Sequence, residues 1–124
     1  MKSIIILFTL FFFIGCSDMG TNPKEIDPHT EVSYQNDIQP IFNSGCVGCH
    51  GSQGQLSLTT YTNTIKGGVS GKVVIPENGE GSLIVKKLRG IAPGQRMPPE
   101  PINPLSGAKI DLLVRWISTG AENN

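Results

Sequence analysis

The feature that most constrains this chain is the run GCVGCHG at residues 45–51, which holds two of its three cysteines. Cys46, Cys49 and His50 form a Cys-x-x-Cys-His arrangement, for which three uses compete. The two cysteines could form a redox disulfide, supply half of a zinc site, or attach a covalently bound haem. The rest of the sequence has to separate these alternatives.

The third cysteine, Cys16, follows an apolar run near the start of the chain. Residues 4–14 read IIILFTLFFFI, which is shorter than the roughly 20 residues that span a bilayer and matches the core of a signal peptide. Gly15 directly before Cys16 resembles the lipobox of bacterial lipoproteins, in which this cysteine carries the lipid. An ordinary secretory signal that happens to contain a cysteine is the alternative. Both interpretations take the mature chain out of the cytoplasm.

A zinc site is disfavoured by the supply and spacing of ligands. Tetrahedral zinc needs four ligands, and only Cys46, Cys49 and His50 lie close together in the sequence. His29 is a candidate fourth ligand. However, the adjacent Cys49 and His50 do not follow the usual spacing of zinc ligands.

The segment before the motif has the apolar spacing of a helix, with these residues at helical intervals: Tyr34, Ile38, Ile41 and Phe42. Pro40 fits only in the first turn of such a helix, because it lacks an N–H and its ring clashes with the preceding turn. We therefore predict a helix that begins near Asp37, is capped by Asn36 or Asp37, and delivers Cys46. A thioredoxin-like disulfide needs the motif at the start of a helix, so this context disfavours it.

Covalent haem attachment accounts for the motif and for a second ligand elsewhere in the chain. Two thiols one turn apart can each add to one haem vinyl group, and the adjacent His50 can then ligate the iron. The loop QRMPPEP, residues 95–101, contains Met97, whose thioether is a soft ligand for haem iron. Core packing is the ordinary role of a methionine, but Pro98 and Pro99 place Met97 outside any regular element.

Residues 32–121 resemble a monohaem cytochrome c domain of the planctomycete type. The matching pieces follow in order: DIQPIF, CVGCHG, LSLTTY, GG, IP, SLIVKKL, RMPP and LSGAKIDLLVRWISTGA. The resemblance implies thioether bonds from Cys46 and Cys49 to one haem c, with His50 and Met97 as axial ligands. Glu77 departs from the pattern, because a glycine commonly follows the proline of the IP turn.

The expected fold class is all-α, a small cytochrome c-like helical fold around the covalently attached haem. We divide the chain into a lipoprotein signal peptide (1–15), a lipidated flexible tether (16–31), the cytochrome c domain (32–121) and a C-terminal tail (122–124). The tether is polar and is interrupted by Pro23 and Pro28, and its His29 is expected to be an ordinary exposed residue.

Two further helices are predicted in the second half of the chain. One runs from Ser82, its N-cap, to Leu88, with Gly90 just past its end. The other follows Ser106 and stops at Gly120, and its apolar stripe consists of Ile110, Leu113, Val114 and Ile117. We expect Trp116, beside this stripe, to pack in the core or against the haem. The glycines of KGGVSGK, residues 66–72, are expected to form turns, because the run lacks the residues of a phosphate-binding loop.

Two protein ligands leave no open iron position for a substrate, so the expected function is electron transfer and not catalysis. We predict a membrane-tethered carrier of single electrons between redox partner proteins, lipid-anchored in the cell envelope on the extracytoplasmic side of a bacterial membrane. The formal net charge of zero offers no electrostatic basis for binding nucleic acid. Two alternatives stay open: a gas sensor in which Met97 is displaced, and an accessory haem subunit of a larger surface enzyme complex.

Four basic residues precede the methionine loop or lie within it: Lys86, Lys87, Arg89 and Arg96. They could guide an acidic partner to the haem edge or offset the haem propionates. An ordinary solvated surface is the alternative.

Overall fold

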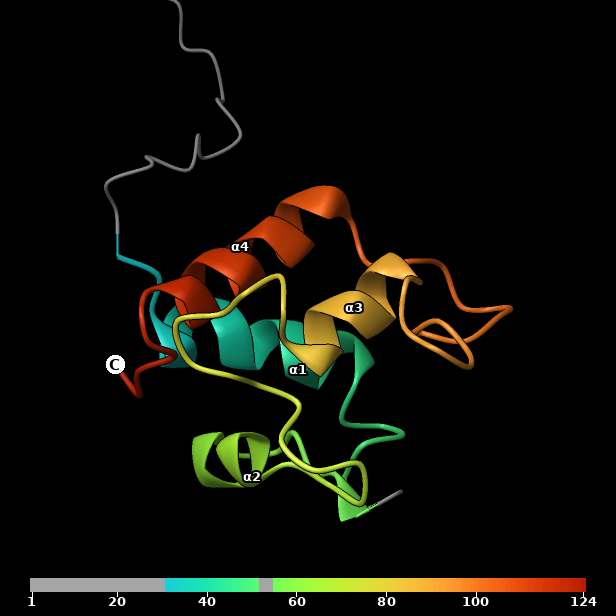
Figure 1. Ribbon diagram of the computed structural model, residues 1–124, viewed down its shortest axis with the longest axis horizontal. Coiled ribbons are helices and arrows are strands. Elements are labelled where there is room, and N and C mark those ends of the chain that lie inside the picture. The colour runs from blue at the N-terminus through green and yellow to red at the C-terminus, as the bar shows by residue number, and fades with distance from the viewer. Residues whose placement is uncertain (1–30, 52–54) are drawn as a thin grey trace, which may run out of the picture.

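The computed structural model describes residues 31–51 and 55–124. Within these ranges the chain has no strand and forms a π-helical turn and four α-helices, in the order η1 (Tyr34–Ile38), α1 (Gln39–Gly45), α2 (Tyr61–Lys66), α3 (Leu83–Arg89) and α4 (Gly107–Ser118) (Figure 1). This small helical domain confirms the predicted all-α class. The predicted signal peptide, Cys16 and His29 lie outside the described residues.

The longest helix, α4, organises the domain. It packs against η1 and against α3, and α1 continues directly from η1. The segment that joins α3 to α4 forms a loop that projects at one end of the molecule, away from the end that holds residue 124 (Figure 1). None of the helices in the described part of the chain is long and apolar enough to cross a membrane.

The first helical segment begins at Tyr34, so the predicted start near Asp37 is wrong. Ser33 is the N-cap instead: its hydroxyl accepts a hydrogen bond from the Asn36 backbone N–H at 3.2 Å, and its own N–H donates to the Asp37 carboxylate at 2.9 Å. The helical segment starts earlier because Tyr34 packs against Trp116 and donates its N–H to the Asn124 side chain. The turn that precedes Pro40, which has no N–H to donate to it, is a wider π-helical turn. Pro40 itself lies in the first turn of α1, as expected.

The two later helices begin and end where their capping residues predict. Ser82 is the N-cap of α3, and Gly90 follows that helix in the left-handed conformation with φ of 71°. The last helix begins after Ser106 and ends just before Gly120, whose φ is 115°. The predicted apolar stripe of α4 is buried except for Val114, which is half-buried.

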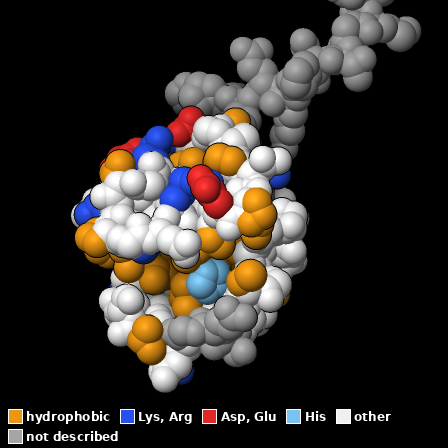
Figure 2. Space-filling model, turned by 90° about the vertical axis from the view of Figure 1, so that its right-hand side faces the viewer, with side chains coloured by type: hydrophobic (Ala, Val, Ile, Leu, Met, Phe, Trp, Pro, Cys, Tyr) orange, Lys and Arg blue, Asp and Glu red, His pale blue; other side chains and the backbone are white. Residues whose placement is uncertain are grey.

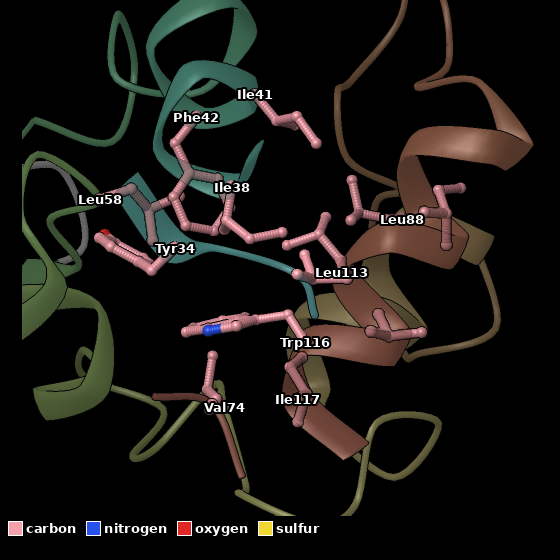
Figure 3. Packing of buried hydrophobic residues seen from close by; sticks show 14 of the residues in the cluster. Tyr34, Ile38, Ile41, Phe42, Leu58, Val74, Leu88, Leu113, Trp116 and Ile117 are labelled. Carbon is pink, nitrogen blue, oxygen red and sulfur yellow. The ribbon is translucent and has the colours of Figure 1, made fainter. Parts of the chain in front are cut away.

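The core is centred on aromatic side chains from both ends of the domain (Figure 3). The Tyr34 ring centroid lies 5.1 Å from that of Tyr61 and 5.3 Å from that of Trp116. Trp116 is 1% exposed, and its Nε1–H donates to the Glu122 carbonyl at 2.9 Å. The predicted core role of Trp116 is confirmed, with its one polar atom satisfied.

Turns of left-handed backbone connect α2 to α3. Gly67 and Gly71 have φ of 82° and 86°, which confirms that the glycines of this run form turns. Glu77 also has a positive φ, of 65°, and its backbone N–H donates to the Ile117 carbonyl at 2.8 Å. A glycine would adopt this conformation without steric cost, so the departure at Glu77 places a side chain where glycine is favoured.

The residues predicted as a C-terminal tail fold back onto the start of the domain. The side-chain oxygen of Asn124 accepts from the Tyr34 N–H at 2.8 Å, and its Nδ2 donates to the Glu31 carboxylate at 2.8 Å. Its backbone carbonyl accepts from the Ser33 hydroxyl at 2.9 Å and from the Gln35 N–H at 3.1 Å. The point where the chain enters the domain therefore lies beside residue 124, at the end of the molecule opposite the α3–α4 loop (Figure 1).

Candidate functional site

A cavity of about 360 Å³ opens between α1, α3 and the α3–α4 loop. Its volume is within the range of about 300–1,000 Å³ that is usual for small-molecule and cofactor sites. Most of its walls are apolar, and they include Ile41, Phe42, Leu56, Leu58, Leu83, Ile84, Leu88 and Leu113. Figure 2 shows a hollow with hydrophobic side chains around a histidine side chain. The site therefore suits a large apolar group with few polar contacts.

The Cys-x-x-Cys-His motif reaches this cavity through a turn that follows α1. Cys46 is the C-cap of the helix, and its N–H donates to the Phe42 carbonyl at 2.8 Å. The Cys46 carbonyl then accepts from the Cys49 N–H at 3.1 Å and from the His50 N–H at 2.7 Å. This turn places all three motif residues on the cavity wall. The prediction that a helix delivers Cys46 is confirmed.

Both cysteines of the motif are free, with Cys46 half-buried and Cys49 exposed. Burial raises the pKa of the Cys46 thiol, and the nearby Cys49 raises it further. A redox-active pair needs a cysteine whose pKa is lowered, commonly by the N-terminus of a helix. Here the motif follows the C-terminus of α1, so the surroundings oppose a thiolate and disfavour thioredoxin-like chemistry.

His50 lines the cavity with a ring nitrogen that the protein leaves unsatisfied. Its Nδ1 is buried and has no hydrogen-bond partner among the described residues. The backbone of the residue is fixed, because the His50 carbonyl accepts from the Leu58 N–H at 2.8 Å. The half-buried imidazole is not held in a side-chain network, so it is available as a ligand.

Met97 reaches the same cavity from the α3–α4 loop. Its side chain is half-buried and packs against the hydrophobic core, and Pro98 and Pro99 line the cavity next to it. Its N–H donates to the Lys87 carbonyl of α3 at 3.0 Å. The structure thus brings two thiols, one imidazole and one thioether to a single apolar cavity, although the thioether comes from a distant part of the sequence.

The residues present fit a haem better than they fit a simple metal ion. Within residues 31–51 and 55–124, no group of three or more His, Cys, Asp or Glu side chains could hold a metal ion. The candidate fourth zinc ligand, His29, lies outside the described residues. The apolar walls, the free thiols and the unsatisfied imidazole suit a flat apolar cofactor that carries its own iron.

The four basic residues do not form one group of free cations. Arg89 pairs with Glu80 at 2.8 Å and with Asp111 at 3.4 Å. The Lys87 ammonium donates to two backbone carbonyls of the α3–α4 loop. Arg96 is half-buried, and its Nη1 has no hydrogen-bond partner in the described part of the chain. A docking patch at these residues stays a prediction. The side chains of two of them, Lys87 and Arg89, already bond to other parts of the domain.

Sequence reasoning identified the four residues with ligand chemistry but missed most of the apolar lining of this cavity, of which Val69 and Phe42 are examples. Val69 lies on the cavity wall although it is 68% exposed. The sequence feature that could have indicated this is a single apolar residue among the turn glycines. Phe42 was predicted as an apolar helix residue but not as cavity lining. Its signal was its position one helical turn before Cys46, which gives both side chains the same face.

Comparison with known families relates most of this site to one family. The model of the planctomycete cytochrome C family matches residues 46–101, a range that begins with the first motif cysteine and extends past Met97. Neither a curated protein nor a solved structure matched the chain.

Proposed function

Since residues 46–101 belong to the planctomycete cytochrome C family, we propose that this chain is a lipid-tethered electron carrier whose haem iron is ligated by His50 and Met97. Family membership implies a covalently bound haem c, a typically non-enzymatic role in electron transfer, and a location outside the cytoplasm. The two axial ligands and the lipid anchor are the finer parts of this proposal.

The observation that carries the proposal is the meeting of four side chains at one apolar cavity. Cys46 and Cys49 are free thiols at its wall and would hold the haem through thioether bonds. His50 offers a nitrogen ligand and Met97 a thioether sulfur. Bound haem supplies a one-electron iron couple, and methionine ligation raises its potential.

The residues around the cavity would keep water from the haem iron and leave one edge of the haem accessible to partners. Buried Phe42 and Leu113 line the cavity and exclude water from it, which is the protein's main contribution beyond ligand choice. Val69 and Ile102 line the cavity while remaining 68% and 49% exposed, so they lie at its mouth. We expect redox partner proteins to approach the haem edge here.

The position of the tether favours access to that mouth. The chain enters the domain beside Asn124, at the end of the molecule away from the Met97 loop (Figure 1). A lipid on Cys16 would therefore hold the domain by the end remote from the loop. A flexible tether attached there would leave the cavity mouth accessible to partners.

Covalent attachment is the first property to test. The parent protein should retain haem peroxidase stain on a denaturing gel and give the pyridine haemochrome spectrum of a c-type haem. Cys46→Ala and Cys49→Ala should each leave at most one thioether and sharply lower the yield of holoprotein. Haem that is removed completely by acid acetone would refute covalent attachment.

Ligation by Met97 separates the electron carrier from the gas-sensor alternative. The reduced parent protein should not bind carbon monoxide readily if both axial positions are filled. Ready binding at low carbon monoxide concentration would favour the sensor. Stable co-purification with a larger enzyme complex would favour the accessory-subunit alternative.

A further inference from the structure

The loop that carries Met97 is attached to the last turn of α3 by two residues. The Lys86 carbonyl accepts the N–H groups of Ile91 at 3.0 Å and Ala92 at 3.3 Å, at the start of the loop, whereas Lys87 makes the contacts nearest Met97. The backbone carbonyl of Lys87 accepts the Met97 N–H at 3.0 Å, and its ammonium donates to the carbonyls of Pro93 and of Gln95, the latter at 3.3 Å. Lys87 is half-buried and also lines the cavity. One residue therefore contacts the loop both before Met97 and at Met97 itself.

The loop is shaped around this ammonium. Gly94, between the two acceptor residues, has φ of 80°, and a Cβ at this position would lie 3.3 Å from the Lys87 Nζ. A side chain there would crowd the ammonium and strain the backbone. The last turn of α3 has carbonyls that no helical N–H can reach, and the loop satisfies them: the Lys87 carbonyl also accepts the Gly90 N–H at 3.2 Å.

We propose that Lys87 is the positioning residue that holds Met97 at the haem iron. This inference rests on the proposed ligation by Met97 and adds the reason why the sulfur stays in place. A thioether is a weak ligand, so its occupancy depends on the effective concentration of the sulfur at the iron. Bonds from a charged donor to two loop carbonyls restrict the loop and keep that concentration high.

Displacement of Met97 by imidazole measures this effect directly. In the ferric holoprotein, imidazole competes with Met97, and its binding removes the long-wavelength charge-transfer band of methionine-ligated haem. Lys87→Met keeps the side-chain length but removes all three donors, so we expect imidazole to bind about tenfold more tightly. Tenfold corresponds to about 1.4 kcal/mol. This is less than two full charge-assisted hydrogen bonds would give, because Lys87 is only half-buried.

Two variants control for charge and for donor capacity. Lys86→Met removes the same charge from the neighbouring position of α3, and within the described residues the Lys86 ammonium has no hydrogen-bond or ion-pair partner. Lys87→Arg keeps a cationic donor at the site. Both variants should bind imidazole within about twofold of the parent.

A second perturbation tests the same contact if Lys87→Met yields no holoprotein. Gly94→Ala crowds the ammonium while retaining Lys87, and it should also tighten imidazole binding. Gly120→Ala places a similar residue at positive φ, 115°, where the nearest other atom lies 3.8 Å away, so it controls for backbone strain alone. Equal imidazole affinity for these two variants would count against the proposal.

The possible results separate this inference from the proposed function. A parent protein without the charge-transfer band would show that Met97 is not the ligand, and the role of Lys87 would then be refuted with it. A parent with the band, together with Lys87→Met that behaves like Lys86→Met, would refute only the positioning role. Tighter imidazole binding confined to Lys87→Met and Gly94→Ala would support it.

Discussion

Replacing Glu77 by glycine should stabilise the domain, because Glu77 occupies a backbone conformation that suits glycine. Its φ is 65°, its side chain is exposed, and the described contacts of the residue include only its backbone N–H, which donates to the Ile117 carbonyl at 2.8 Å. Glu77→Gly keeps that hydrogen bond. The change therefore isolates the cost of holding a side chain in the left-handed region.

The magnitude is the difference between two opposing effects. A residue with a Cβ in the left-handed conformation costs about 1–2 kcal/mol, and this strain is relieved. Glycine gains conformational freedom in the unfolded chain, which opposes folding by about 0.4–1 kcal/mol. The midpoints of these two ranges give a net gain of about 0.8 kcal/mol, or a rise in Tm of about 3–6 °C for a domain of this size.

Thermal unfolding of the holoprotein, followed by far-ultraviolet circular dichroism, measures this change. Glu77→Ala is the matched control, because it removes the carboxylate but keeps the Cβ, and it should leave Tm within about 1 °C of the parent. If alanine stabilises as much as glycine, the effect comes from the charge and not from the backbone. A Tm for Glu77→Gly at or below that of the parent would refute the reasoning.

Three further predictions concern the ligand, the anchor and the core. Met97→Ala should abolish the charge-transfer band of the ferric protein and open the ferrous protein to carbon monoxide, whereas an unchanged visible spectrum would show that another residue is the sixth ligand. Cys16→Ala should prevent acylation, leaving the product unprocessed or in the soluble fraction, and membrane association equal to that of the parent would contradict the lipobox interpretation. Burial raises the pKa of Tyr34 above its ordinary 10.0, so the folded protein holds this proton more tightly than the unfolded chain does. The free energy of unfolding should therefore fall as pH rises above about 10, and Tyr34→Phe should flatten that fall in urea titrations between about pH 8 and 11.

The sequence alone determines those features of this protein that depend on residues close together in the chain. The spacing of Cys46, Cys49 and His50 keeps them close together, and in the structure they share the turn that follows α1. Ser82 and Gly90 mark the ends of α3: Gly90 adopts the left-handed conformation that ends a helix, and Ser82 occupies the N-cap position although its hydroxyl bonds to Ile75 and Asn78 and not to the helix. The periodicity of α4 similarly identifies the face that is buried.

The start of the first helix shows where such local reasoning fails. Pro40 was correctly expected in the first turn of an α-helix. However, the sequence does not reveal that a π-helical turn precedes this helix or that Ser33 is the cap. That choice depends on the packing of Tyr34 against Trp116 and on the hydrogen bond that the Tyr34 N–H donates to the Asn124 side chain. Both partners are distant in the sequence, and their contribution overrides the local capping preference of Asn36 and Asp37.

Only the tertiary structure decided which distant segments meet at the cavity. Met97 was identified by its chemistry, but its approach to His50 depends on α3, which carries the loop through the Lys87 carbonyl and ammonium. No pattern in the sequence distinguishes Lys87 from Lys86, because the two differ only in the direction that the helix gives them. That direction is fixed when the buried side of α3 packs against α4, since the burial of Val85 and Leu88 determines which of the lysines faces the loop.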